Sequence, residues 1–280
     1  MAFNKSIVSA DWLNSNLSAP NIKILDASWY LPVVDRDPKE EYKSGHIPGA
    51  FFFDIDVICD LSSDFPHMLP SPEKFASCIK DFGIGDCHRV IVYDGSGMFS
   101  AARVYWMFKV FGFEDVAVLN GGFPIWKDSG YQVTTTVRPV QMHNFTVRKN
   151  STMVADSKEV KEACISRAAQ VLDARAPDRF WGKVSEPRHG LRSGHIPNSL
   201  NIPFQSVLNK DGTFKTVAEL SDVFGDAGVN LNKPIITSCG SGVTAAILNL
   251  ALEQLDAKKV SLYDGSWCEW GSSEKFRIQT

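Results

Sequence analysis

The stretch VIVYDGSGMFSAARVYWM, residues 90–107, returns later in the chain as PIITSCGSGVTAAILNLA, residues 234–251. Each copy contains a short β-branched run, then a glycine turn, then a stretch with helical apolar spacing. One difference between the copies concerns chemistry, because Cys239 stands where the first copy has Asp94. The pattern predicts two similar α/β units, of which only the second carries a cysteine directly after this strand.

Three further landmarks repeat in the same order, roughly half the chain length apart. They are KILDAS (23–28) with QVLDAR (170–175), YKSGHIPGAFFFDI (42–55) with LRSGHIPNSLNIPF (191–204), and VAVLNGGFPIW (116–126) with VSLYDGSWCEW (260–270). So long a period excludes a solenoid, whose repeats span about 20–50 residues. The 280-residue chain is therefore predicted to hold two copies of one domain, each near the usual domain size.

We expect an N-terminal domain over residues 1–138, a linker over 139–152 and a C-terminal domain over 153–280. The segment that joins the copies, about residues 131–152, is rich in Thr and Val and has no helical apolar spacing, which indicates an extended chain. Within each copy, near-continuous apolar runs alternate with helical stretches such as 71–84 and 100–113. This alternation is typical of an α/β domain with a small parallel sheet and helices on both faces.

Composition excludes several classes of protein. The net charge of −3 gives no electrostatic reason to expect nucleic acid or an acidic membrane surface as partner. No apolar run approaches the ~18 residues that a membrane span needs, and the N-terminus resembles neither a secretory signal nor a transit peptide. The six cysteines show no CxxC pair and no Cys/His ligand spacing, so we expect neither a disulfide scaffold nor a metal site. We therefore expect a cytoplasmic protein with free thiols.

Cys239 is the candidate nucleophile. It follows the predicted strand PIITS, and in parallel sheets ligands gather at the carboxyl ends of strands. Gly240 and Gly242 permit a tight loop whose N–H groups point inward, with the positive end of the next helix behind them. Thr244 is placed to cap that helix. Such a nest lowers the pKa of a thiol from ~8.5 toward ~3.5–7.5. The other five cysteines are predicted to be small buried hydrophobic residues.

These features resemble the rhodanese-fold sulfurtransferases over essentially the whole chain. The resemblance lies in the tandem repeat, the two GHIP segments, and a loop cysteine confined to the second copy. In that family, the thiosulfate branch carries Cys-Arg-Lys-Gly-Val-Thr and the 3-mercaptopyruvate branch carries Cys-Gly-Ser-Gly-Val-Thr. Residues 239–244 match the second sequence at all six positions.

The resemblance implies a double displacement. Cys239 would take the sulfur of 3-mercaptopyruvate as a persulfide, release pyruvate, and pass the sulfur to cyanide or to a thiol acceptor such as thioredoxin. It implies no metal and no organic cofactor. The remaining residues of the loop would bind the substrate: Gly240, Gly242, Val243 and Thr244.

The resemblance also implies two further groups of site residues. Arg179 and Arg188 match arginines that hold the substrate, and a guanidinium fork suits a carboxylate. Ser241, His67 and Asp56 match an arrangement that could pass protons as the enolate forms. The alternative for His67 is that it only ties down an interdomain loop.

His46 and His195 occur in both copies and are expected to be structural.

The sequence leaves one alternative function open and disfavours two others. A thiosulfate sulfurtransferase stays open as the alternative, although residues 240 and 241 carry no cation. A cysteine phosphatase needs Cys-x5-Arg, and position 245 is alanine, so this reading fails. An intact loop with both arginines disfavours a non-enzymatic sulfur carrier or regulatory module.

Overall fold

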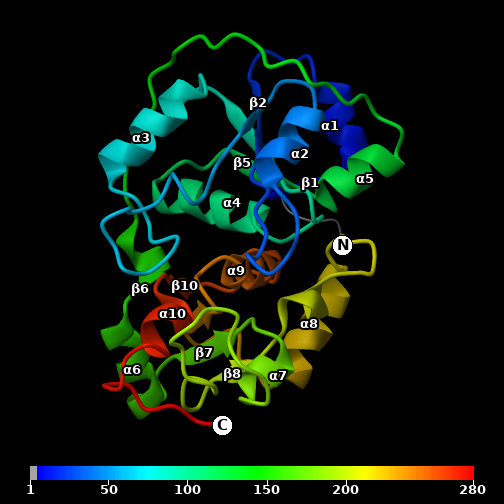
Figure 1. Ribbon diagram of the computed structural model, residues 1–280. Helices are drawn as coiled ribbons and strands as arrows, with labels where there is room; N and C mark the ends of the chain where they lie inside the picture. Colours follow the sequence, from blue (N-terminus) through cyan, green and yellow to red (C-terminus); the bar gives the residue numbers. More distant parts are fainter. Residues whose placement is uncertain (1–4) are drawn as a thin grey trace.

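The computed structural model describes residues 5–280 and contains two parallel five-stranded sheets (Figure 1). Their strand orders are β1-β5-β4-β2-β3 and β6-β10-β9-β7-β8, so the second sheet repeats the first. All ladders between the described strands are parallel. The predicted fold class, two tandem α/β domains, is confirmed.

The N-terminal half contains β1 (Ile7–Val8), α1 (Ala10–Asn16), β2 (Ile22–Asp26), α2 (Pro38–Ser44), β3 (Ala50–Phe52), α3 (Pro72–Asp81), β4 (Arg89–Tyr93), α4 (Ala101–Val110), β5 (Val116–Leu119) and α5 (Gly122–Asp128). The C-terminal half contains a 3-10 turn (Ser151–Met153), β6 (Val154–Ala155), α6 (Ser157–Ser166), β7 (Gln170–Asp173), α7 (Pro177–Phe180), β8 (Leu200–Asn201), a second 3-10 turn (Phe204–Val207), α8 (Val217–Asp226), β9 (Ile235–Ser238), α9 (Ala245–Gln254), β10 (Val260–Tyr263) and α10 (Ser266–Trp270). The short β-branched runs of the repeated segments are strands: KILDAS, VIVYD and VAVLN contain β2, β4 and β5, and QVLDAR, PIITS and VSLYD contain β7, β9 and β10.

Helices cover both faces of each sheet. In the N-terminal domain, α1 and α5 pack on one face, while α3 and α4 pack on the other. In the C-terminal domain, α6 and α10 share one hydrophobic cluster, while α8 and α9 belong to the other. This arrangement explains the near-continuous apolar strands, because both of their faces are buried.

The domains meet through α4 and α9, the helices that follow the two glycine turns. Both helices are buried on nearly all sides and contact each other at the middle of the molecule (Figure 1). One hydrophobic cluster therefore runs through both domains. A loop at the carboxyl end of a strand in one domain is consequently close to side chains of the other domain.

The chain after α5 is extended and returns along the N-terminal domain (Figure 1). Thr134 forms an antiparallel bridge with His46, and Phe145 is buried against Phe75 and Phe113. No helix within residues 5–280 is both long enough and apolar enough to cross a membrane.

Candidate active site

The loop that follows β9 holds Cys239 against the start of α10. The Cys239 N–H donates to Ser266 Oγ at 3.2 Å, and the Cys239 carbonyl accepts from Trp267 N–H at 3.0 Å. Gly242 has a φ of +74°, and a Cβ there would lie 2.9 Å from Arg103 Nη1. Glycine at 242 is thus required by both the backbone angle and the space. Cys239 itself is buried, with 2% of its surface exposed.

Thr244 is the N-cap residue of α9, as predicted, but the expected side-chain capping bond is absent. A capping side chain needs an extended N-cap backbone, whereas Thr244 has φ −76° and ψ −17°, which is helical. The prediction of a hydroxyl cap was therefore wrong. The loop runs into α9 as a continuous turn.

The first copy of the loop holds an anion. Four backbone N–H groups donate to the carboxylate of Asp94, those of Ser96 (2.9 Å), Phe99 (2.7 Å), Ser100 (2.9 Å) and Ala101 (2.9 Å). This glycine turn is therefore a nest of amide donors that accommodates a negative charge. The second copy repeats this glycine turn after β9, with Cys239 in the place of Asp94.

Ser241, His67 and Asp56 form one chain of hydrogen bonds across the domain boundary. His67 Nδ1 lies 3.0 Å from Ser241 Oγ, and His67 Nε2 lies 2.9 Å from Asp56 Oδ1. Trp29 Nε1–H donates to the second oxygen of Asp56 at 2.9 Å. Ser241 and His67 are buried, while the Asp56 side chain is largely exposed.

Electrostatics determine the protonation states of Asp56 and His67 before substrate binds. The hydrogen bond from His67 lowers the pKa of Asp56, with further lowering by Trp29 and by the charge of Arg188. Burial lowers the pKa of His67 below its usual 6.5. At neutral pH the carboxylate is ionised and the ring is neutral. The ring then donates from Nε2 to Asp56 and accepts the Ser241 hydroxyl proton at Nδ1.

Arg103 of α4 and Asp264, just after β10, lock the loops of both domains together. Arg103 is fully buried and its Nη2 lies 2.7 Å from Asp264 Oδ1. The guanidinium also donates to the carbonyls of His67 and, at 3.3 Å, of Gly242. Asp264 accepts from Leu69 N–H at 2.8 Å. These bonds hold His67 in its left-handed conformation, φ 62°, which is uncommon for a residue with a Cβ.

Arg179 of α7 reaches the loop that contains Cys239. Its Nε and Nη2 donate to the buried carboxylate of Glu186, which also pairs with Arg175 Nη1 at 2.8 Å. A Cβ at position 240 would lie only 3.1 Å from Arg179 Nη2. Glycine at 240 thus leaves room for the guanidinium beside Cys239.

Arg188 faces the same site. Its positive charge lowers the pKa values of Asp56 and His67. Among the described residues 5–280, none forms a hydrogen bond or ion pair with the guanidinium of Arg188, which is half-buried. The positive charge of Arg188 therefore lies close to the Asp56–His67 pair.

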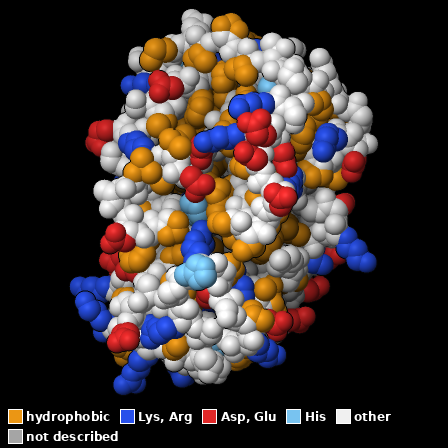
Figure 2. Space-filling model, in the orientation of Figure 1, with side chains coloured by type: hydrophobic (Ala, Val, Ile, Leu, Met, Phe, Trp, Pro, Cys, Tyr) orange, Lys and Arg blue, Asp and Glu red, His pale blue; other side chains and the backbone are white. Residues whose placement is uncertain are grey.

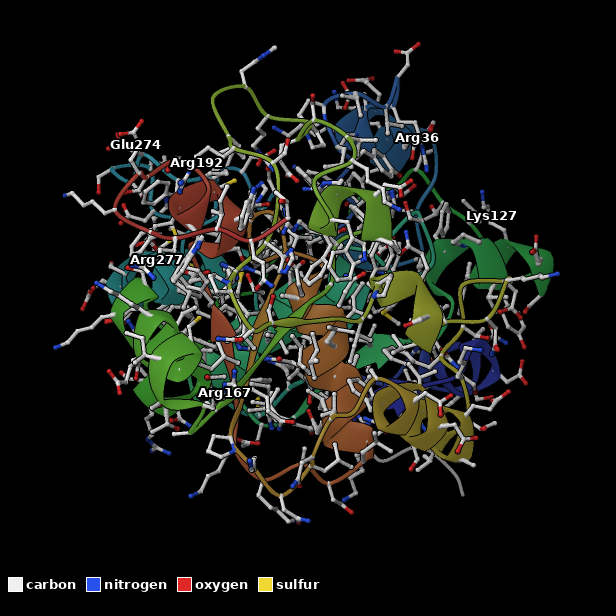
Figure 3. The ribbon with its side chains drawn as sticks, turned by 90° about the horizontal axis from the view of Figure 1, so that it is seen from below. Arg36, Lys127, Arg167, Arg192, Glu274 and Arg277 are labelled. Carbon is white, nitrogen blue, oxygen red and sulfur yellow. The ribbon has the colours of Figure 1, made fainter. Side chains whose placement is uncertain are left out.

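Other arginines and histidines near the site support the fold. Arg175 is buried between Asp173 and Glu186, and Arg192 donates to carbonyls after α10, against which it lies in Figure 3. His46 Nδ1 lies 2.8 Å from a backbone carbonyl of α2, and His195 Nδ1 lies 2.9 Å from one of α7.

Sequence reasoning missed Arg103, Asp264, Glu186 and Trp29. Arg103 had a usable signal, since it is a lone charge inside the apolar stretch SAARVYWM. Asp264 and Glu186 act through residues distant in sequence, so the linear pattern carried no signal for them.

The other five cysteines are free thiols, but they do not all fit the prediction of small buried residues. Cys59 and Cys268 are buried, and burial raises the pKa of Cys268 to about 11. Cys78 and Cys164 are half-buried, and Cys87 is exposed. Cys87 precedes β4 in a turn at the surface, so burial was the wrong expectation there.

The site lies between the domains, where histidine and basic side chains gather at the middle of the face in Figure 2. A cavity of about 1060 Å³ lies elsewhere, beside α4, α6 and α9. Its lining includes Ile235 and Ile236 in β9 but not Cys239, which follows that strand. This cavity is therefore not the active site.

Comparisons with known proteins agree with this geometry. The rhodanese-like domain family matches residues 9–129 and 156–273. A 3-mercaptopyruvate sulfurtransferase of Escherichia coli is 42% identical in its crystal structure, with a TM-score of 0.87, covering 94% of this chain and 99% of that one. The curated E. coli protein of that name is 44% identical over 97% of each chain. A mitochondrial thiosulfate/3-mercaptopyruvate sulfurtransferase of Arabidopsis thaliana is 42% identical, covering 99% of this chain and 79% of that protein.

Proposed function

This chain belongs to the rhodanese family of sulfurtransferases, and we propose that it transfers the sulfur of 3-mercaptopyruvate through a persulfide on Cys239. The observation that carries the choice of donor is the loop itself. Gly240 and Ser241 stand where the thiosulfate branch has two cations, and Gly240 leaves room for Arg179. A single carboxylate held by arginines suits this site better than a dianion held by the loop.

The first half-reaction moves one sulfur atom and one proton. The Cys239 thiolate attacks the thiol sulfur of 3-mercaptopyruvate, so that an S–S bond forms and the S–C bond breaks. The electron pair of the broken bond stays on carbon as the enolate of pyruvate. In the balanced reaction, the proton lost by the Cys239 thiol ends on the methyl group of pyruvate. A group that accepts this proton and returns it to the enolate therefore accelerates the transfer.

Ser241, His67 and Asp56 are suited to this proton transfer. The neutral ring of His67 can take a proton through the Ser241 hydroxyl, because Nδ1 is the acceptor at 3.0 Å. The ionised Asp56 stabilises the imidazolium that forms. The same path returns the proton to the enolate carbon. A relay of this kind needs no metal and no organic cofactor.

The loop and the arginines bind the reactants. The amides of residues 240–244 would stabilise the thiolate and the persulfide, as the Asp94 carboxylate is stabilised in the first copy. Gly242, Val243 and Thr244 contribute backbone to this nest. Arg179 keeps its Nη1 edge for the substrate, because Glu186 occupies Nε and Nη2. With Arg188 it would hold the carboxylate and the ketone.

In the second half-reaction the acceptor, a thiolate or cyanide, attacks the outer sulfur, the S–S bond breaks, and Cys239 leaves as the thiolate. A small thiol, thioredoxin or cyanide would serve as acceptor. Thiosulfate sulfurtransferase activity is the second candidate, because the Arabidopsis relative carries both substrates in its name. A cytoplasmic location stays a prediction.

The test is the ratio of kcat/KM for 3-mercaptopyruvate to that for thiosulfate, with cyanide as the common acceptor. We expect 3-mercaptopyruvate to be favoured at least tenfold, and a ratio below one would contradict the assignment. Cys239→Ser should abolish pyruvate release, whereas Cys268→Ala, the matched change in the neighbouring buried thiol, should retain it.

A further inference from the structure

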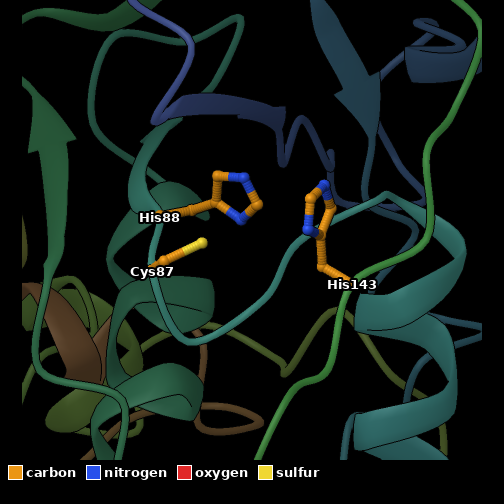
Figure 4. A group of neighbouring side chains, drawn as sticks. All are labelled: Cys87, His88 and His143. Atoms are coloured by element: carbon orange, nitrogen blue, oxygen red, sulfur yellow. The ribbon is translucent and has the colours of Figure 1, made fainter.

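We propose that Cys87, His88 and His143 form a binding site for a borderline divalent cation, of which Zn²⁺ is the best match. The sulfur of Cys87 and a nitrogen from each histidine all lie within 4.8 Å of one another. Within the part of the chain that the structure describes, this is the one such group of three found. In Figure 4 the sulfur of Cys87 points toward the space between the two rings.

The site lies away from the catalytic loop. Cys87 and His88 immediately precede β4, whereas the anion nest of this domain follows the other end of that strand. His143 comes from the linker, far along the chain. This distance in sequence explains why no metal-ligand spacing was visible, and why the sequence predicted no metal site.

The backbone, rather than the side chains alone, brings the linker to this turn. Asp86 N–H donates to Asn144 O at 3.0 Å, and Thr146 N–H and Oγ1 donate to the Asp86 carboxylate at 2.8 Å and 2.7 Å. A Cβ on Gly85 would lie 2.5 Å from His143 Cβ. Only glycine admits the linker here, so the backbone brings the three side chains close to one another.

The donor set selects the class of metal. One thiolate and two imidazoles are ligands that Zn²⁺ binds in tetrahedral geometry, with water in the fourth position. Bond lengths of ~2.0–2.3 Å require donor atoms ~3.3–3.8 Å apart. The present spacing of up to 4.8 Å therefore needs a closure of about an ångström. The exposed Cys87 and half-buried His143 side chains can supply it by rotation.

One hydrogen bond of the metal-free site bears on binding. Gly85 N–H donates to His88 Nδ1 at 2.9 Å. A metal on Nδ1 displaces this amide, and a metal on Nε2 moves the ring proton onto Nδ1. In either case, Gly85 N–H loses its acceptor.

The experiment is a titration of the reduced full-length protein with Co²⁺, which reports tetrahedral thiolate ligation by visible d–d bands and a near-ultraviolet charge-transfer band. We expect one Co²⁺ per chain, displaced by Zn²⁺. The same titration on Cys239→Ser should be unchanged, which separates this site from the catalytic thiol. Cys87→Ser should abolish the charge-transfer band, and His143→Ala should weaken Co²⁺ binding at least tenfold. Cys78→Ser is the matched control in the same domain and should change nothing.

A second readout locates the metal. In the Cys239→Ser variant, Zn²⁺ should remove the protection of the Gly85 amide, so that its hydrogen exchange becomes faster. In the Cys87→Ser variant, Zn²⁺ should leave this exchange rate unchanged. The proposal is overturned if the unmodified protein shows no bands, if the charge-transfer band survives Cys87→Ser, or if Cys239→Ser removes the bands. Sulfurtransferase turnover distinguishes this proposal from the proposed function, because Cys87→Ser and His143→Ala should leave it unchanged.

Discussion

Arg179 lies directly against Gly240, with its Nη2 3.1 Å from the position that a Cβ at residue 240 would occupy. The guanidinium cannot shift freely, because the buried Glu186 binds the same nitrogen, Nη2. The side chain at 240 therefore sets where Arg179 stands relative to Cys239. An arginine at 240, as in the thiosulfate branch, is incompatible with this placement on grounds of both volume and charge.

Gly240→Ala should raise KM for 3-mercaptopyruvate about fivefold with little change in kcat. The added methyl group displaces Arg179 by a few tenths of an ångström and weakens its bond to the substrate carboxylate, which corresponds to about 1 kcal/mol. Steady-state kinetics measure this directly. Gly225→Ala is the matched control, since a Cβ there meets nothing within 4 Å. An unchanged KM in Gly240→Ala would show that Arg179 does not bind the substrate.

Gly240→Arg combined with Ser241→Lys should shift preference toward thiosulfate. The two new cations suit a dianionic donor, while the displaced Arg179 weakens binding of mercaptopyruvate. We expect the ratio of kcat/KM values, thiosulfate over mercaptopyruvate, to rise at least tenfold. If the ratio stays constant while both activities fall, the loop does not select the donor.

The sequence was sufficient to predict the repeat, the two parallel sheets and the place of Cys239, because each depends on local pattern. VIVYD and PIITS are long enough to show a buried strand, and the glycine turn after each is explicit. The strands β1 and β8 have two residues each, and so short a strand shows no recognisable hydrophobic pattern in the sequence. Their positions depend on pairing with neighbours.

The contacts across the domain boundary could not be read from the sequence. Arg103 and Asp264 meet only because α4 and α9 pack together, and nothing in the linear order joins them. Likewise Glu186 sits between two candidate arginines, but its pairing with Arg179 depends on the path of the loop after α7. The family resemblance could identify His67 and Ser241 as candidate residues. The distance of 3.0 Å between His67 Nδ1 and Ser241 Oγ, however, depends on how the two domains pack.

The pH dependence of kcat/KM should show an acid limb below pH 6.5. Burial lowers the pKa of His67, so the ring remains a proton acceptor through neutral pH and loses activity only when it is protonated. Asp56 raises the pKa of His67, so Asp56→Asn should move the limb to still lower pH. Arg188 lowers it, so Arg188→Gln should move the limb the other way. If neither substitution shifts the pH of the acid limb, His67 only holds the interdomain loop in place.

Arg103→Lys should lower kcat about tenfold and leave KM nearly unchanged. A lysine keeps the charge beside Asp264, but one ammonium group cannot also reach the carbonyls of His67 and Gly242. The ring of His67 then loses its fixed position relative to Ser241. Kinetics well below the unfolding temperature, with the acid limb as second readout, separate this effect from instability. Normal kcat would show that Arg103 serves stability alone.

Asp94→Ala should destabilise the N-terminal domain by about 3–5 kcal/mol, because four backbone N–H groups lose a charged acceptor and three of them surround one oxygen. Asp94→Asn keeps an oxygen for those three and should cost only about 1–2 kcal/mol. Urea unfolding measures both, and Asp128→Ala, an exposed change in the same domain, should be within about 0.5 kcal/mol of the unmodified protein. Equal effects of Asp94→Ala and Asp94→Asn would show that the turn does not depend on an anion acceptor. The nest inferred around Cys239 would then lose its structural precedent, because that precedent rests on the carboxylate of Asp94.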